Sequence, residues 1–188
     1  MEIKQAKLYD AARKLFLEQG FKATNIAAIA SKAGVAVGTF YNFYPSKSAI
    51  FIDIYNAENE QVKQSILSEV DLTGDPKKVV RKIVQEILKQ SQANLILQEW
   101  FVNAALNRQI SKTNKNAVTD SVVYATLMTL IDSWEKRKLL KVGMSKERII
   151  SLFNALTVID FHQSEIQTDN YFQVLNDLID GILLVILK

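Results

Sequence analysis

Apolar residues recur every three or four positions along most of the chain, which is the spacing of one face of an α-helix. The first such run covers residues 8–16 and is followed by Gly20, a residue type that commonly ends helices. Thr24 or Asn25 can cap a second, short helix that Gly34 ends, because glycine accepts the left-handed conformation of a helix C-terminus. The chain is therefore predicted to begin with two helices separated by a tight break.

A third predicted helix covers residues 37–44. It cannot extend further, because Pro45 disfavours helical geometry in the residue before it. Ser46 then caps a fourth helix, which begins at Lys47. The third helix is thus short, and the turn that follows it is tight.

Longer helices are predicted for the rest of the chain. Asp75 and Pro76 give a start signal for the fifth, a cap followed by proline in the first turn. The apolar pattern then predicts helices over residues 93–107, 116–140, 145–162 and 169–187. No pair of alternating segments typical of strands interrupts this series. The pattern predicts an all-α protein of about nine helices.

The composition agrees with long helices and limits the chemistry. The 188 residues include 6 Gly and 2 Pro, where average usage gives about 22 such residues. With no Cys and one His, disulfides, thiolate metal sites and a poly-histidine metal centre are excluded. The chain also lacks a nucleophile beside a base, paired inward carboxylates and a glycine-rich phosphate loop. We therefore expect no enzyme activity, no cofactor and no metal.

Basic charge is concentrated at the start of the chain. Residues 1–50 hold seven basic and three acidic side chains, a net charge of +4, whereas the remaining residues carry −1. This bias is a modest indication of a polyanionic partner such as nucleic acid. Residues 1–20 lack the apolar stretch of a signal peptide, and the longest apolar run, 182–187, is too short to span a membrane. We expect a cytoplasmic protein without membrane association.

The second and third predicted helices form a helix-turn-helix pattern. Two short helices joined by residues 34–36 and braced by apolar neighbours can place the second helix in a DNA major groove. An ordinary three-helix packing unit has the same pattern, so the exposed residue types matter. Small side chains lead the third helix, which lets its backbone approach a surface. Lys47 opposes the dipole of the fourth helix, a position that a bound phosphate explains.

A set of ordered motifs lies within the first 48 residues: Ala11-Ala12 with Leu15-Phe16, Gly20-Phe21 with Thr24, Ile29-Ala30, Ala33-Gly34-Val35, Gly38-Thr39-Phe40-Tyr41-Asn42 and Pro45-Ser46-Lys47. This run resembles the N-terminal signature of the TetR family of bacterial transcriptional regulators. The resemblance implies a homodimer whose recognition helices read successive major grooves of a palindromic operator. It also implies a DNA-binding domain over residues 1–48 and a helical effector-binding and dimerisation domain over 49–188.

The resemblance assigns roles to individual residues. Thr24 and Asn25 would approach phosphate at the start of the second helix, and Tyr41 and Lys47 would hold the DNA backbone. The residues that would face or skirt the bases are Val37, Gly38, Thr39 and Asn42. Asn42 suits adenine, and the methyl groups of Thr39 and Val37 suit thymine.

Three positions depart from the family pattern. Ala27, Val37 and Phe43 stand where the family often has a polar residue. Each departure removes a polar contact to DNA, so we expect a shallow salt dependence of DNA binding. The order Phe43-Tyr44 also predicts that Tyr44 is partly buried and needs a partner for its hydroxyl.

The C-terminal part is predicted to dimerise and to bind a small molecule. Its last two helices are apolar on more than one face, and a twofold mate can cover the excess. The predicted dimer contacts are Phe153, Leu156, Leu175, Leu178, Ile179, Gly181 and Ile182. Candidate ligand contacts, which ordinary core packing also explains, are Trp100, Asn103, Tyr124, Met128 and Trp134.

The sequence thus predicts a ligand-responsive DNA-binding transcriptional regulator. We expect a repressor that binds double-stranded operator DNA as a homodimer and is released by a small-molecule effector. The alternative is an all-helical dimeric interaction or small-molecule-binding protein with lost or weak DNA binding.

Overall fold

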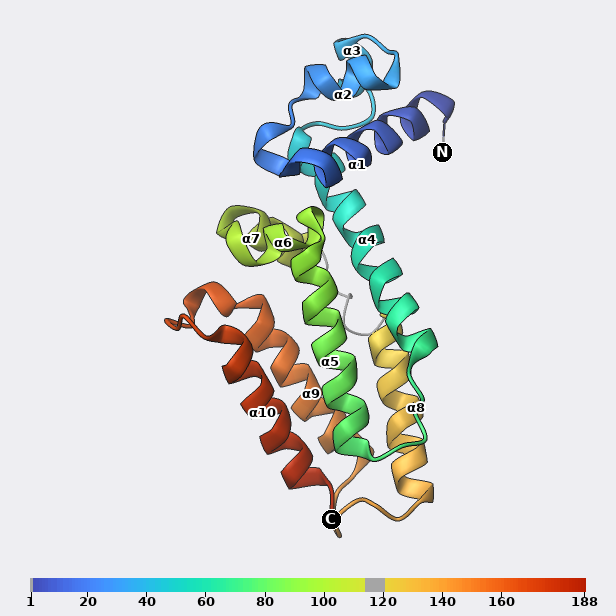
Figure 1. Ribbon diagram of the computed structural model, residues 1–188, viewed down its shortest axis with the longest axis vertical. Helices are drawn as coiled ribbons and strands as arrows, with labels where there is room; N and C mark the ends of the chain where they lie inside the picture. The colour runs from blue at the N-terminus through green and yellow to red at the C-terminus, as the bar shows by residue number, and fades with distance from the viewer. Residues whose placement is uncertain (1, 114–120) are drawn as a thin grey trace. The chain divides into compact units, whose positions relative to one another are not determined.

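The computed structural model describes residues 2–113 and 121–188 (Figure 1). The predicted all-α class is confirmed, because these residues form α-helices, one short 3-10 helix and a single isolated β-bridge. The helices are α1 (Ile3–Ala23), α2 (Ile26–Ala33), α3 (Val37–Tyr41), α4 (Lys47–Glu69), α5 (Pro76–Ala93), α6 (Leu95–Val102), α7 (Ala104–Thr113), α8 (Val122–Lys136), α9 (Lys146–Phe161) and α10 (Tyr171–Ile186).

Three of the predicted helix starts are confirmed by side-chain caps. Asn25 Oδ1 accepts a hydrogen bond from Ala28 N at 2.8 Å, and Ser46 Oγ accepts one from Ala49 N at 3.1 Å. Asp75 Oδ1 does the same for the first turn of α5. Each cap gives a free backbone N–H of the first turn a partner.

The prediction of one helix over residues 93–107 is wrong. The structure has two helices there, α6 and α7, separated at Asn103, whose φ of −125° and ψ of 86° are not helical. Asn103 Oδ1 accepts from Leu106 N at 3.2 Å and so starts α7. Asparagine side chains compete with backbone carbonyls for N–H groups, which is why this residue breaks the helix.

Three predicted helix ends also move. The helix predicted over 37–44 ends at Tyr41, because the N–H groups of Phe43 and Tyr44 both turn back to Phe40 O at 3.0 Å. In the described part of the helix predicted over 116–140, α8 ends at Lys136, shortly before Lys138 with φ of 57°. The helix predicted over 169–187 is α10, Tyr171–Ile186.

The chain forms two compact units. Unit 1 comprises Met1–Val62 and Leu88–Ile110, and unit 2 comprises Lys63–Ile87 and Ser111–Lys188. Helices α4 and α5 contribute residues to both. The boundary expected at residue 48, between the DNA-binding domain and the effector-binding domain, stays a prediction.

The core of unit 1 holds α1, α2 and α3 around aromatic rings. Phe16 of α1 lies 5.0 Å from Phe51 of α4, measured between ring centroids, and Phe51 lies 4.9 Å from Phe21. Ile29 of α2 and Phe40 of α3 are fully buried. Edge-to-face aromatic contacts of this kind add to the stabilisation from buried area, so the two short helices are fixed on α1 and α4.

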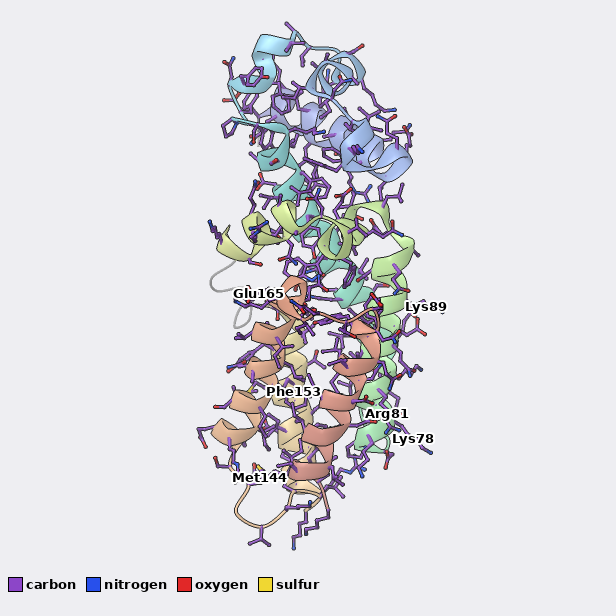
Figure 2. The ribbon with its side chains drawn as sticks, turned by 90° about the vertical axis from the view of Figure 1, so that its left-hand side faces the viewer. Lys78, Arg81, Lys89, Met144, Phe153 and Glu165 are labelled. Atoms are coloured by element: carbon purple, nitrogen blue, oxygen red, sulfur yellow. The ribbon has the colours of Figure 1, made fainter. Side chains whose placement is uncertain are left out.

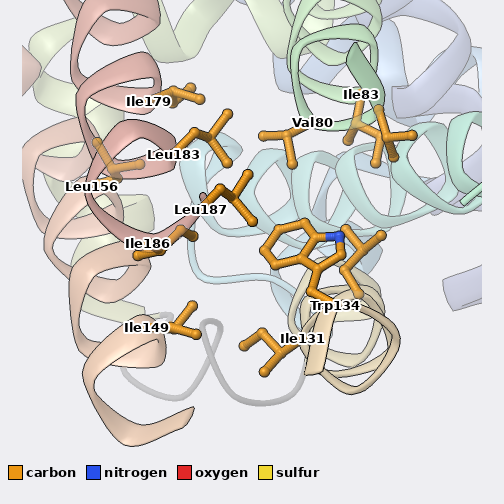
Figure 3. Close-up of a cluster of buried hydrophobic side chains, with 12 residues drawn as sticks. Val80, Ile83, Ile131, Trp134, Ile149, Leu156, Ile179, Leu183, Ile186 and Leu187 are labelled. Atoms are coloured by element: carbon orange, nitrogen blue, oxygen red, sulfur yellow. The ribbon is translucent and has the colours of Figure 1, made fainter. Parts of the chain in front are cut away.

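The core of unit 2 surrounds Trp134, which is fully buried on α8 (Figure 3). Val80 and Ile83 of α5 lie on one side of this cluster, and Leu183 and Ile186 of α10 lie on another. At the surface of the unit lies Arg81 of α5 (Figure 2). It forms a two-bond ion pair with Asp180 of α10, with N–O distances of 2.7 and 2.6 Å. No helix in the described ranges is long and apolar enough to cross a membrane.

Candidate nucleic-acid interface

Helices α2 and α3 are joined by a sharp turn at Gly34. Gly34 has φ of 69° and ψ of 34°, the left-handed conformation that glycine adopts without a steric penalty. Its N–H donates to Ser31 O at 3.1 Å, and Val35 N donates to Ala30 O at 3.0 Å. These two bonds close the C-terminus of α2 and redirect the chain into α3.

Helix α3 presents one face outward and holds the other in the core. Phe40 is fully buried and anchors the helix, whereas Val37 is 44% exposed and Tyr41 is 55% exposed. Gly38 and Asn42 are exposed as well, and Thr39 is half-buried. The outward face predicted for residues 37–42 is therefore present. Base contacts require such exposure, and the contacts themselves stay predictions.

The side chain of Thr24 faces the protein interior. Thr24 is fully buried, and its Oγ1 donates to Gly20 O at 2.8 Å. Gln19 Nε2 donates back to Thr24 Oγ1 at 3.2 Å. The hydroxyl expected to approach phosphate thus has two partners inside the chain. Asn25, the next residue, is exposed and caps α2.

Lys47 is also engaged with the protein. Its Nζ donates to Phe21 O at 2.7 Å and to Thr24 O at 2.6 Å. The same nitrogen lies 4.1 Å from the centroid of the Phe21 ring, within the range of a cation–π interaction. Burial lowers the pKa of the Lys47 ammonium. The expected phosphate contact of Lys47 therefore competes with three interactions within the chain.

In the aromatic pair Phe43-Tyr44 after α3, Tyr44 is buried as predicted. Tyr44 is 4% exposed. Burial raises the pKa of the Tyr44 hydroxyl, so this ring serves the core of unit 1.

The sequence pattern gave no sign of a buried carboxylate network in unit 1. Glu58 of α4 is 5% exposed, and its Oε1 accepts from Arg13 Nε at 2.5 Å. Its Oε2 accepts from Asn94 Nδ2 at 3.1 Å, and Asn94 also caps α6. These residues are far apart in the sequence, and no local pattern links them.

The five candidate ligand contacts fall in different units. In unit 1, Trp100 stacks on Tyr55 with ring centroids 6.1 Å apart, and Asn103 Nδ2 donates to Glu99 Oε2 at 2.9 Å. In unit 2, Tyr124 and Met128 are half-buried and Trp134 is fully buried.

The Trp134 indole adds one unexplained polar atom to the core of unit 2. Its Nε1 is buried and has no hydrogen-bond partner among the described residues. Most buried polar atoms in proteins have such a partner.

The predicted dimer contacts divide into an inner and an outer set. Leu156 and Ile179 are buried in the hydrophobic core of unit 2, and Phe153, Leu175 and Ile182 pack against it. Of the predicted residues, Leu178 and Gly181 lie on the exposed side of α10.

Three exposed apolar residues of this surface were not among the predicted contacts: Val158 (57% exposed), Leu184 (63%) and Val185 (45%). Their helical phase, opposite the buried positions of α9 and α10, could have identified them. Figure 2 shows α9 and α10 from the outside.

Comparisons with known proteins agree with the sequence signature. The family model for bacterial regulatory proteins of the tetR family matches residues 8–54. The chain is 31% identical over 85 residues to the HTH-type transcriptional regulator AcrR of Shigella flexneri, covering 45% of this chain and 40% of that protein. It is 26% identical over 101 residues to the HTH-type transcriptional repressor KstR of Mycolicibacterium smegmatis, covering 54% and 50%. The matches thus span half or less of these relatives.

A solved structure extends the likeness to the whole fold. Thermus thermophilus FadR, a TetR-family transcriptional repressor in complex with lauroyl-CoA, superposes with a TM-score of 0.58 at 19% identity. The match covers 98% of this chain and 95% of that one. At this level of identity the likeness concerns the fold alone.

Proposed function

We propose that this chain, which belongs to the TetR family of bacterial regulatory proteins, regulates transcription by binding double-stranded operator DNA. Its curated relatives are transcriptional regulators and not enzymes. The observation that carries the proposal is the outward face of α3, presented on a helix whose other side is anchored by the buried Phe40. A short helix held this way can enter a major groove about 12 Å wide.

The exposed residues of α3 supply the base contacts in this proposal. Asn42 pairs with adenine, and the methyl groups of Val37 and Thr39 contact thymine. Tyr41 donates its hydroxyl to the DNA backbone, and Asn25 brings the N-terminus of α2 to a phosphate. Gly38 lets the backbone of α3 approach the base edges. Residues 1–48 form the DNA-binding domain and residues 49–188 the effector-binding and dimerisation domain.

The dimer in this proposal forms through α9 and α10. Leu178, Leu184 and Val185 of α10 and Val158 of α9 are large apolar side chains left exposed by one copy of the chain. A Cβ added at Gly181 would face open space beyond the backbone of its own helix, so the missing side chain leaves room for a second copy to approach α10 closely. The buried Leu156 and Ile179 support this surface from beneath.

The dimer surface can be tested by placing a carboxylate on it. Val185→Glu is expected to shift the protein from dimer to monomer in sedimentation equilibrium, because an interface core does not tolerate an unpaired charge. Thr129→Glu, which places the same charge on the exposed side of α8, is the control and should leave the dimer intact. A Val185→Glu protein that remains as dimeric as the control contradicts this assignment.

The proposed regulator is a repressor released by a small molecule. The effector contacts proposed in unit 2 are Tyr124, Met128 and Trp134. The Trp134 indole N–H supports this, because it is buried without an acceptor among the described residues. Trp100 and Asn103 lie in unit 1, and their expected ligand contacts stay predictions. An effector that prefers the DNA-free geometry by about 1–3 kcal/mol lowers operator affinity 5- to 150-fold.

The DNA-binding proposal is tested by selecting duplexes from a random library with the full-length protein. We expect a palindrome whose half-sites lie about one helical turn apart. Asn42→Ala should weaken binding to the selected duplex about 10- to 100-fold and relax the preference at one base pair. Gln173→Ala on the exposed side of α10 is the control. If no sequence is enriched, or if Asn42→Ala binds like the control, the proposal fails.

The alternative is an all-helical dimeric interaction or small-molecule-binding protein with lost or weak DNA binding. The inward hydrogen bonds of Thr24 and Lys47 favour it, because two groups expected on phosphate have partners inside the chain. Under this alternative the library selection enriches nothing, while Val185→Glu still converts a dimer to a monomer.

A further inference from the structure

The ammonium group of Lys47 is surrounded on three sides by groups of its own unit. Two sides are the carbonyl oxygens of Phe21 and Thr24, at 2.7 and 2.6 Å, and the third is the face of the Phe21 ring. Hydrogen bonds from an ionised donor are about twice as strong as neutral ones. We call Lys47 and the carbonyl groups of Phe21 and Thr24 the carbonyl brace.

The carbonyls of the brace belong to the segment 21–24, which comprises the last three residues of α1 and the residue that follows them. Gly20, with φ of 76° and ψ of 175°, interrupts the helical geometry of α1 just before this segment. Carbonyl groups at a helix C-terminus lack partners within the helix and carry partial negative charge. A lysine ammonium is therefore a favourable partner at this place, and it comes from the first residue of α4.

Thr24 closes the same segment from the other side. Its hydroxyl donates to Gly20 O, its backbone carbonyl accepts from Lys47, and Gln19 Nε2 donates to both Thr24 Oγ1 and Ala23 O. Thr24 is also the residue directly before Asn25, the N-cap of α2. The direction in which α2 leaves α1 is thus fixed by bonds to Thr24.

We propose that Lys47 and Thr24 are positioning residues for DNA recognition, which hold the start of α2 and through it α3, and that Lys47 does not contact DNA phosphate. This inference rests on the proposed function. It assigns Lys47 a different role from the phosphate contact expected from the sequence. The part-buried position of its ammonium and the two carbonyl partners agree with a group already committed to the chain.

The salt dependence of DNA binding distinguishes the two roles. A lysine that neutralises a phosphate releases a counterion, so removing it lowers the slope of log K against log salt by about 0.9. A positioning lysine changes the affinity and leaves the slope unchanged. The probe is the duplex selected from the random library by the wild-type protein, measured between 50 and 200 mM KCl as a practical range.

The test compares Lys47→Met with Ser46→Ala in the full-length chain. Lys47→Met removes the ammonium but keeps an unbranched side chain, and we expect at least a tenfold loss of affinity with the wild-type slope. Ser46→Ala removes the cap of the same helix and leaves the carbonyl brace intact, so it should destabilise α4 without this loss. Both are measured at a temperature where circular dichroism shows them folded, which separates positioning from stability alone.

Thr24 provides a second pair of variants. Thr24→Val has nearly the same shape but lacks the hydroxyl, and Thr24→Ser keeps it. We expect Thr24→Val to lose affinity with an unchanged slope and Thr24→Ser to restore most of the affinity. Equal affinities of the valine and wild-type proteins overturn the role of Thr24.

The wild-type protein gives an independent readout that needs no variant. In protein labelled with ¹⁵N-lysine, the Lys47 ammonium signal should be visible without DNA, because its hydrogen bonds slow proton exchange, and it should not shift when the duplex is added. A shift on DNA binding, or a slope lowered by about 0.9 in Lys47→Met, overturns the inference while the proposed function stands. A wild-type protein that binds no duplex overturns the proposed function itself, and the positioning role falls with it.

Discussion

The buried carboxylate of Glu58 allows a quantitative prediction about which partner matters more. The Glu58 side chain is 7% exposed and the Arg13 side chain is 41% exposed. Arg13→Ala leaves a buried carboxylate with Asn94 as its partner in the network, and breaking a fully buried pair in this way costs about 3–5 kcal/mol. Because water already screens part of the Arg13 charge, we expect a loss of about 2–3 kcal/mol of unfolding free energy.

The reverse substitution should be milder. Glu58→Gln leaves the charge on the partly solvated Arg13 and keeps one acceptor oxygen, so we expect a loss of about 1–2 kcal/mol. In the double variant Arg13→Met with Glu58→Met, neither charge remains. Its loss should therefore be smaller than the sum of the two single methionine substitutions.

Tryptophan fluorescence can report this unfolding from unit 1 alone. The chain has two tryptophans, so a Trp134→Phe background leaves Trp100, which stacks on Tyr55 in the same unit as Glu58. Urea unfolding of each variant in this background gives the free energies. The reasoning is refuted if Glu58→Gln costs more than Arg13→Ala, or if the two methionine substitutions are additive.

Two further predictions concern unit 2. Burial raises the pKa of the Tyr171 hydroxyl, which donates to Asp160 at 2.8 Å. A group whose pKa is raised by folding stabilises the protein below its ordinary pKa and loses this contribution above it. The wild type should therefore lose more unfolding free energy than Tyr171→Phe from about pH 10 upward. Equal losses in urea titrations at pH 8 and 11 contradict this. Trp134→Phe should change the unfolding free energy by less than about 1.5 kcal/mol, because the lost contacts are offset by removing an indole N–H without an acceptor. A urea midpoint that implies a loss above about 3 kcal/mol would mean that the Trp134 N–H has an acceptor.

The fold was largely predictable because local signals decide it. The apolar spacing, Gly34 and the caps at Asn25, Ser46 and Asp75 each act within a few residues, and the structure has a helix boundary at each. The break at Asn103 was missed because an asparagine inside an apolar run is compatible with a continuous helix until its side chain bonds the backbone.

The site was less predictable because its roles depend on distant partners. The exposed face of α3 follows from its helical period. The inward orientation of Lys47 depends on carbonyls 23 and 26 residues earlier, and no spacing rule links them. Likewise, periodicity marked α9 and α10 as broadly apolar, but only the packing of one chain shows that Leu156 and Ile179 face inward while Leu178 faces outward.

The carboxylate of Glu58 has a consequence for building chimeras between relatives. Exchanging residues 1–48 for those of another regulator replaces Arg13 and keeps Glu58 and Asn94. These two residues then face a first helix from the other protein. Such a hybrid keeps the buried Glu58 carboxylate, but the residue at position 13 that would pair with it now comes from the other regulator. A transplant that retains an arginine at position 13, or replaces position 58 at the same time, avoids this mismatch.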